Sequence, residues 1–209
     1  MFFSYVVSNP SIVANLLWEH LQMVGLSCLI TVLLAVPLAL LVNNYPRFSM
    51  LIMGILGIVY TIPSLALIIF FVPILGLNAR PVILAMVLYS QVILVRNLVA
   101  GLRGIPPDIY EAAQGMGMNS WQQWWWVEVP LILPLFLAGV RLGAVVAIAV
   151  ATIGAKFGAG GLGTLLFDGI AQTDRYDKIW AGVISVVLLA LVINTGLLLL
   201  EKLATKQPT

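Results

Sequence analysis

Side chains that could carry out chemistry are few and widely separated in this sequence. It has one histidine, His20, and one cysteine, Cys28, and no acidic residue lies between Glu19 and Asp108. No group of His, Cys, Asp or Glu has the spacing of a metal site or of an activated nucleophile. We therefore expect that the chain is not an enzyme and binds no metal.

A glycine-rich run is the one stretch that suggests nucleotide chemistry. It comprises Gly158, Gly160, Gly161 and Gly163 within six residues. The run lacks the Gly-x-x-x-x-Gly-Lys-Ser/Thr spacing of a phosphate-binding loop. Two interpretations stay open, namely a compact loop of closely packed backbone and a tight turn that enters a short helix.

The most specific spacing lies in the polar segment 101–130. Asp108 and Glu111 have the three-residue separation of a capping box, and Ser120 and Gln123 repeat it. Gly117, between the two pairs, suits the left-handed residue that ends a helix. The segment therefore predicts two short helices with a sharp bend. Such a rigid element serves docking or the transmission of force, because an ordinary connection needs only a few polar residues.

The elements that must position this loop are membrane helices. Of the 209 residues, 62% are hydrophobic and 9% are charged, and the mean hydropathy is +1.09. A helix needs about 20 apolar residues to cross about 30 Å of hydrocarbon. We predict one all-α membrane domain with five transmembrane helices. Its spans are 21–42, 50–71, 82–99, 131–153 and 179–200, with a coupling loop at 101–130 and an external loop at 154–178.

Charges within and beside the spans give the orientation only weakly. A net charge of +2 excludes a nucleic-acid surface. Placing the N-terminus outside and the C-terminus in the cytoplasm puts six Lys and Arg residues inside and four outside. We expect Arg96 to reach the interface from the end of its span. For Arg141 there are two possibilities, an ion pair with Glu128 or a place at the cytoplasmic interface, and we favour the interface. We expect His20 at the external interface.

Two further groups of residues have both a functional and a structural interpretation. Thr61, Pro63 and Ser64 are candidates for a translocation pathway, although a simple packing kink at the proline is an equal alternative. The tryptophans could form cation–π contacts, but their place just before a span favours anchoring at the lipid headgroups. They are Trp121, Trp124, Trp125 and Trp126.

The polar segment resembles the EAA loop of bacterial ABC-importer permeases. The likeness lies in Glu111-Ala112-Ala113, in Gly117 and in Val127-Glu-Val-Pro130, where valines replace Ile and Leu of the family pattern. The resemblance implies the type I (MetI-like) permease fold, with this loop docked on a cytoplasmic ATPase. It implies ATPase contacts for Glu111, Ala112 and Gly117. We assign Asp108, Ala113, Gly115 and Ser120 to the same coupling set.

Three stretches resemble the permeases of osmoprotectant uptake systems. They are 61–67, 111–118 and 151–163, and methionine permeases share a similar glycine run. The resemblance implies a pathway for glycine betaine, carnitine or choline, with methionine or another small polar solute as the alternative. It also implies that the glycine run caps the pathway or contacts a substrate-binding protein.

The partners follow from the same resemblance. An ion-coupled secondary transporter, the alternative from another class, normally carries acidic residues within its spans, and none lies in the five predicted here. Five spans are also too few to enclose a pathway alone. We therefore expect a second copy or a homologous permease, a cytoplasmic ATPase dimer that holds ATP and Mg²⁺, and an extracytoplasmic binding protein. We place the chain in a bacterial inner membrane, without a cofactor of its own.

Overall fold

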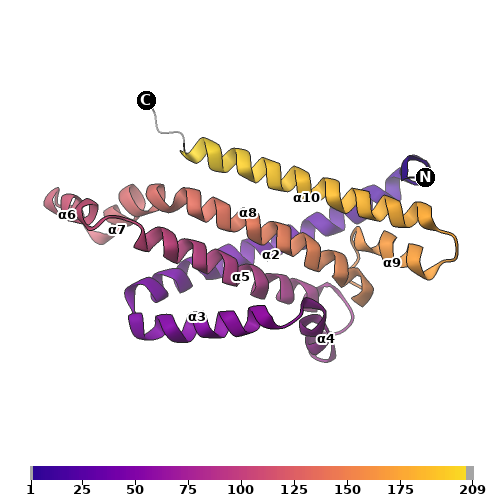
Figure 1. Cartoon of the computed structure of the whole chain (residues 1–209), viewed down its shortest axis with the longest axis horizontal. Helices are drawn as coiled ribbons and strands as arrows, with labels where there is room; N and C mark the ends of the chain where they lie inside the picture. The colour runs from indigo at the N-terminus through magenta and orange to yellow at the C-terminus, as the bar shows by residue number, and fades with distance from the viewer. Residues whose placement is uncertain (1, 206–209) are drawn as a thin grey trace.

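The computed structural model describes residues 2–205, which form helices and short turns with no strand among them. Two helices lie at opposite ends of an elongated bundle, α6 at one end and α9 at the other, and we name the ends after them (Figure 1). The helices in chain order are α1 (Phe2–Ser8), α2 (Pro10–Asn44), α3 (Pro46–Thr61), α4 (Ser64–Leu75), α5 (Ala79–Arg103), α6 (Pro107–Gly115), α7 (Ser120–Gln123), α8 (Val129–Gly154), α9 (Gly163–Ala171) and α10 (Tyr176–Thr205).

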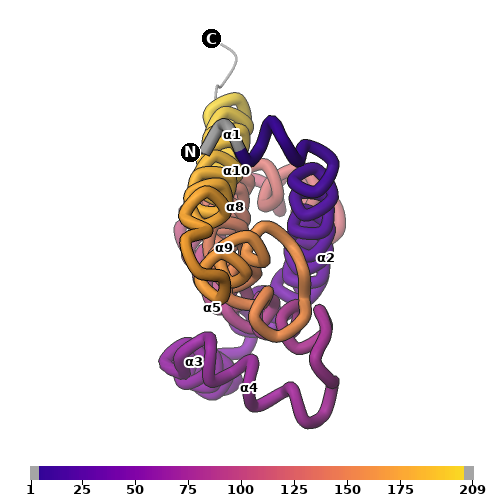
Figure 2. The backbone as a smooth tube through the Cα atoms, turned by 90° about the vertical axis from the view of Figure 1, so that its right-hand side faces the viewer, coloured from indigo at the N-terminus to yellow at the C-terminus, as the bar shows by residue number. Residues whose placement is uncertain are grey.

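Helix α5 forms the centre of the bundle. It packs along α8 and α2, with α3 and α4 beyond it on one side and α10 at the far edge (Figure 2). In its most apolar 18-residue window 67% of residues are buried, against 6% in α10. Apolarity does not cause this difference, because the mean hydropathy of α10 is the higher, 2.7 against 2.0 for α5, and an apolar helix surface can face lipid as well as protein.

Within residues 2–205, four helical stretches are long and apolar enough to cross a membrane, namely α2, α5, the continuous helix Ser120–Phe157 and α10. The predicted second span, 50–71, instead falls on α3 and α4, which are bent by 97°. The bend is at Ile62, whose ψ of 127° is extended, because a following proline excludes the helical conformation. The Tyr89 hydroxyl donates a hydrogen bond to the Ile62 carbonyl, which has left the helix ladder.

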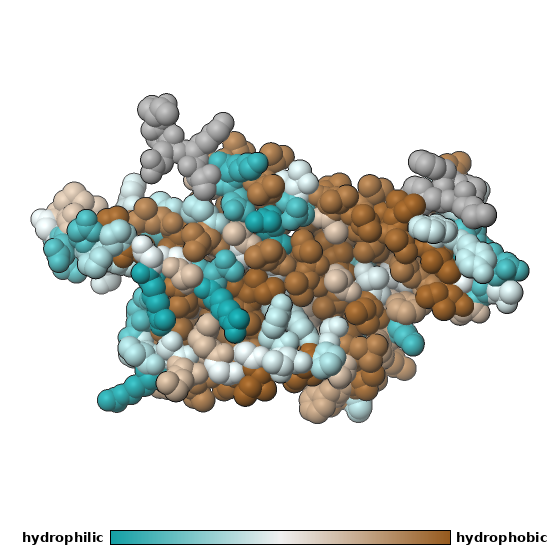
Figure 3. All heavy atoms as spheres, viewed as in Figure 1, coloured by the Kyte–Doolittle hydropathy of each residue, from teal (hydrophilic) through white to brown (hydrophobic). Residues whose placement is uncertain are grey.

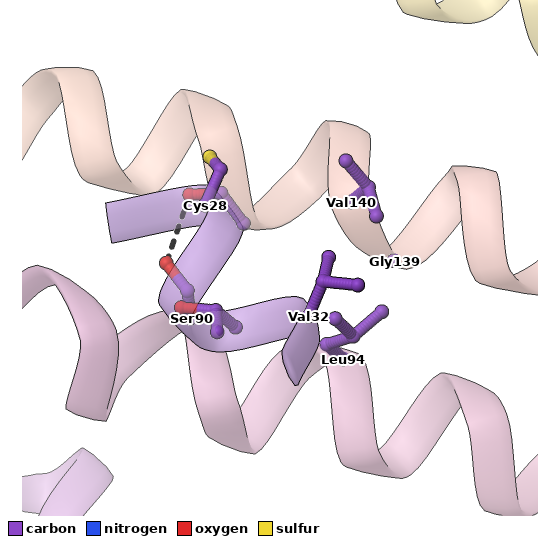
Figure 4. Close-up of a pocket in the computed structure, with 8 residues that line it drawn as sticks. Cys28, Val32, Ser90, Leu94, Gly139 and Val140 are labelled. Atoms are coloured by element: carbon purple, nitrogen blue, oxygen red, sulfur yellow. Dashed lines mark hydrogen bonds between the residues drawn. The ribbon is translucent and has the colours of Figure 1, made fainter. Parts of the chain in front are cut away.

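Glycines allow α8 to approach α5 at the centre of the bundle. A Cβ on Gly139 would lie 2.8 Å from Leu94 Cδ1, and one on Gly143 would lie 3.3 Å from Ser90 Cβ. The Ser90 hydroxyl donates to the Gly143 carbonyl at 3.1 Å, beside a small cavity that Cys28 also lines (Figure 4). Direct packing therefore closes the interior of the single chain at this crossing.

Candidate functional site

Helix α6 begins at two prolines rather than at a side-chain cap. Pro106 is the N-cap residue, with an extended ψ of 140°, and no side chain caps the helix. The predicted capping box of Asp108 and Glu111 is therefore wrong. A capping box needs a backbone N–H on the N-cap residue, which a proline lacks. Asp108 lies in the first turn, where a negative charge favours the helix dipole.

The end of α6 is a Schellman turn at Gly117, which confirms the left-handed conformation predicted there. Its φ is +76°. The Met118 N–H donates to the Ala113 carbonyl at 3.1 Å, and the Gly117 N–H donates to the Gln114 carbonyl at 2.9 Å. These two bonds satisfy carbonyls that the helix end leaves free. The turn thus fixes the direction in which the chain leaves α6.

The second capping box is present, one residue earlier than predicted. Asn119 Oδ1 accepts from the Gln122 N–H, and Gln122 Oε1 accepts from the Asn119 N–H, both at 2.9 Å. Ser120 and Gln123 are not the capping pair, and the Gln123 amide donates to the Met118 carbonyl instead. The helix that starts here is also not short. It continues through a π-helical turn, Trp124–Glu128, into α8.

One face of α6 is exposed, and the opposite face packs against the rest of the protein. Most residues of the predicted coupling set are exposed, whereas Ala113 is 1% exposed and faces inward. Burial raises the pKa of Tyr110, and the nearby Glu128 carboxylate raises it further. Ile109 and Tyr110 also pack against the core cluster of α2, α5 and α8, so α6 rests on the end of the bundle. The exposed members are Asp108, Glu111, Ala112, Gly115, Gly117 and Ser120.

The tryptophans around the π-helical turn divide between surface and core. Trp121 and Trp125 meet edge to face with ring centroids 5.6 Å apart, and Trp126 is 76% exposed. Trp124 packs against the core cluster of α2, α5 and α8. The three exposed rings present apolar surface beside α6, the arrangement expected of side chains that anchor at lipid headgroups.

The glycine run forms a tight turn that leads into α9 at Gly163. Gly158, Gly160 and Gly161 all have φ near +80°. The Gly161 N–H donates to Glu19 Oε2 at 2.9 Å, and a Cβ on Gly163 would lie 2.1 Å from the Thr152 carbonyl oxygen. Sequence reasoning missed Glu19, because 142 residues separate it from Gly161.

Two of the remaining predictions concern residues that lie inside the protein. His20, expected at the external interface, is fully buried beneath the glycine run. Arg141 does not pair with Glu128, which lies about 20 Å away on the same helix. It forms an ion pair with Glu201 of α10, at 3.1 Å.

In the described part of the chain no three His, Cys, Asp or Glu residues are grouped as metal ligands.

The predicted pathway residues lie at the bend between α3 and α4. Thr61 and Pro63 are exposed and Ser64 is half-buried. The Thr61 hydroxyl donates locally, to the Ile58 carbonyl at 2.7 Å. The bend lies toward the α9 end, away from α6 and α7 (Figure 1). The structure therefore keeps the pathway candidates and the coupling loop at separate ends of the bundle.

These features define a class of membrane protein: a helix bundle that exposes a capped loop at one end. Residues 31–206 match the family described as "Binding-protein-dependent transport system inner membrane component". The chain therefore belongs to that family of ABC-transporter permeases.

Curated relatives cover most of the chain. The carnitine transport permease protein OpuCB of Listeria monocytogenes is 37% identical over 88% of this chain and 84% of its own length. The osmoprotectant import permease protein OsmW of Salmonella typhimurium is 36% identical, over 91% and 90%. The glycine betaine/carnitine/choline permease protein OpuCB of Bacillus subtilis is 33% identical, over 90% and 86%.

Solved structures share the fold at lower identity. An inward-facing MetNI methionine ABC transporter has a chain that matches with a TM-score of 0.83 at 20% identity, covering 93% of this chain and 97% of that one. An amino acid ABC transporter matches with a TM-score of 0.74 at 19% identity, over 97% and 96%. The fold is therefore that of MetI-type permeases, as predicted.

Proposed function

We propose that this chain is the permease subunit of an ATP-driven importer for a compatible solute such as glycine betaine, carnitine or choline. The relatives at 33–37% identity carry names that specify these cargoes. The observation that carries the mechanism is the displayed face of α6, on which Glu111 and Ala112 are exposed beside a rigid glycine turn. A short helix held by its own turn can transmit movement of a partner to the helix that follows it.

The proposed topology and partners follow from that loop. The α6 end faces the cytoplasm, where an ATPase dimer that binds ATP and Mg²⁺ docks on α6, and the N-terminal end faces outside. The closed interior at the crossing of α2, α5 and α8 supports a pathway formed between two permeases, either two copies or a homologous pair. An extracytoplasmic binding protein delivers cargo at the α9 end.

Co-purification and uptake test this proposal together. The tagged chain is expressed with the ATPase, permease and binding-protein genes encoded beside it, in a host that lacks its own osmoprotectant importers. We expect the ATPase to co-purify, and accumulation of radiolabelled glycine betaine, carnitine or choline to require its catalytic site. Uptake that persists without the ATPase would contradict the proposal in favour of a secondary transporter. Uptake of none of the three would contradict the cargo.

A further inference from the structure

Arg103, the last residue of α5, forms hydrogen bonds to both helices that meet at Tyr45, the joint between α2 and α3. Its Nη2 donates to the Val42 carbonyl of α2 at 3.3 Å and to Ser49 Oγ of α3 at 3.1 Å. The joint lies at the α6 end of the bundle (Figure 1). One guanidinium therefore connects the ends of three helices.

The Val42 carbonyl needs a donor from outside its own helix. In a continuous helix it would accept from the N–H four residues later, but that residue is Pro46, which has no N–H. The last backbone bond of α2 runs from the Tyr45 N–H to the Leu41 carbonyl, at 3.0 Å. Arg103 supplies the missing donor, and its positive charge is favourable at the C-terminal ends of both α2 and α5.

The connection from Arg103 to α6 is short and anchored. It consists of Gly104, Ile105 and Pro106. The Gly104 N–H donates to the Ala100 carbonyl at 3.0 Å, and Ile105 is buried in the same core cluster as Val42. Pro106 has a fixed φ. Such a connection leaves little slack, so a displacement of α6 displaces Arg103 as well.

Arg47 provides a comparison at the same end of the molecule. It is exposed in the first turn of α3, and within residues 2–205 no hydrogen bond or ion pair joins it to another helix. Hydrophilic residues gather at this end between α6 and the start of α3 in Figure 3. Arg47 and Arg103 both place a positive charge at this end, but of the two only Arg103 joins helices.

We propose that Arg103 is a positioning residue that transmits displacement of α6 to the joint between α2 and α3. With its two hydrogen bonds in place, the ends of α2, α3 and α5 move together when α6 moves. Without them, α5 follows α6 and the joint does not. The inference rests on the proposed function, in which an ATPase docks on α6 and drives its movement.

Hydrogen exchange tests the connection itself, without any cargo. The Phe48 and Ser49 N–H groups both donate to the Tyr45 carbonyl, at 3.0 and 3.1 Å. In Arg103→Gln the joint loses its tie to α5, so these amides should exchange about three- to tenfold faster. Arg47→Gln is the matched control and should leave their protection unchanged. Mass spectrometry on peptides that cover 45–50, with the full chain in lipid nanodiscs, makes the comparison.

A transport assay tests the transmission of movement. The assembled transporter in proteoliposomes is given whichever of radiolabelled glycine betaine, carnitine and choline the wild type takes up. We expect R103Q to lower the ratio of cargo transported to ATP hydrolysed by about three- to tenfold, at unchanged assembly and Tm. Ser49→Ala removes one acceptor and should have a smaller effect. The double variant should be no worse than R103Q, because both changes break the same connection.

Each result decides a separate part of the inference. Unchanged exchange in R103Q would overturn the connection, and faster exchange with a wild-type transport ratio would overturn the transmission. Equal losses of coupling in R103Q and R47Q would assign the effect to positive charge at this end and overturn the positioning role. A wild-type transporter that carries none of the three cargoes would instead refute the proposed function and the transmission with it, whereas the exchange result would still decide the connection.

Discussion

Glu19 and Gly161 join the first long helix to the turn before α9 through a single hydrogen bond of 2.9 Å, from the glycine N–H to the carboxylate. The neighbouring Gly160 adds a steric condition, since a Cβ there would lie 2.4 Å from Glu19 Oε2. A larger residue at this position would therefore displace the end of the Glu19 side chain. Its φ of +78° also favours glycine.

Replacement of Gly160 by alanine should destabilise the protein. A left-handed alanine costs about 1–2 kcal/mol, and the contact with Glu19 adds to that. For a chain of this length each kcal/mol corresponds to about 2–4 °C in Tm. The matched control is Gly196→Ala in α10, where a Cβ meets nothing within 4 Å. Thermal unfolding in detergent compares the two, and an equal Tm for both variants would show that Gly160 is not constrained.

Removal of the Glu19 carboxylate should release the Gly161 amide. In Glu19→Ala the N–H loses its acceptor, so its hydrogen exchange should become faster, whereas Glu19→Gln keeps an acceptor and should change it less. Exchange measured by mass spectrometry on peptides that cover 158–163 checks this. Unchanged exchange in E19A would mean that the turn is held by its other contacts.

Substitutions at Gly117 separate the shape of the α6 turn from its surface. Gly117→Val places a β-branched residue at a φ of +76° and should uncouple ATP hydrolysis from uptake while the protein stays in the membrane. Gly117→Asn tolerates the left-handed conformation and should retain most coupling. The ratio of cargo transported to ATP hydrolysed is the measurement. Normal coupling in G117V would argue against docking through this turn.

The capping box predicts different effects for adjacent residues. Asn119→Ala removes the side-chain acceptor of the Gln122 N–H and should cost about 1 kcal/mol of local stability. Ser120→Ala should cost little, because its hydroxyl makes no cap bond. Hydrogen exchange of the amides of residues 121–123 should rise in N119A alone. The reverse order would restore the register predicted from the sequence.

Local spacing in the sequence predicted the loop better than it predicted contacts across the bundle. Gly117 was placed correctly, because a left-handed helix end is a property of a few neighbouring residues. The first residue of each loop helix was misplaced, since Pro106 and Asn119 compete as caps with Asp108 and Ser120. The partners of Glu19 and Arg141 could not be predicted, because helix packing alone brings Gly161 and Glu201 to them.

The ion pair between Arg141 of α8 and Glu201 of α10 provides a last test, of how the outermost helix is held. The two side chains are 21% and 22% exposed, and Arg141 Nη1 also lies 3.4 Å from Asn194 Oδ1. Glu201→Ala leaves a half-buried guanidinium without its carboxylate, so we expect a loss of about 1–3 kcal/mol.

The double variant Arg141→Met with Glu201→Met should recover most of that loss, because two apolar side chains can replace a half-buried pair without leaving a charge unsatisfied. Thermal unfolding of Arg141→Met, of Glu201→Met and of the double variant forms a complete cycle. A loss in the double variant equal to the sum of the two single losses would show that the two residues act independently. Helix α10 would then be held by its apolar contacts with α8 and α9, and the ion pair would be incidental to its docking.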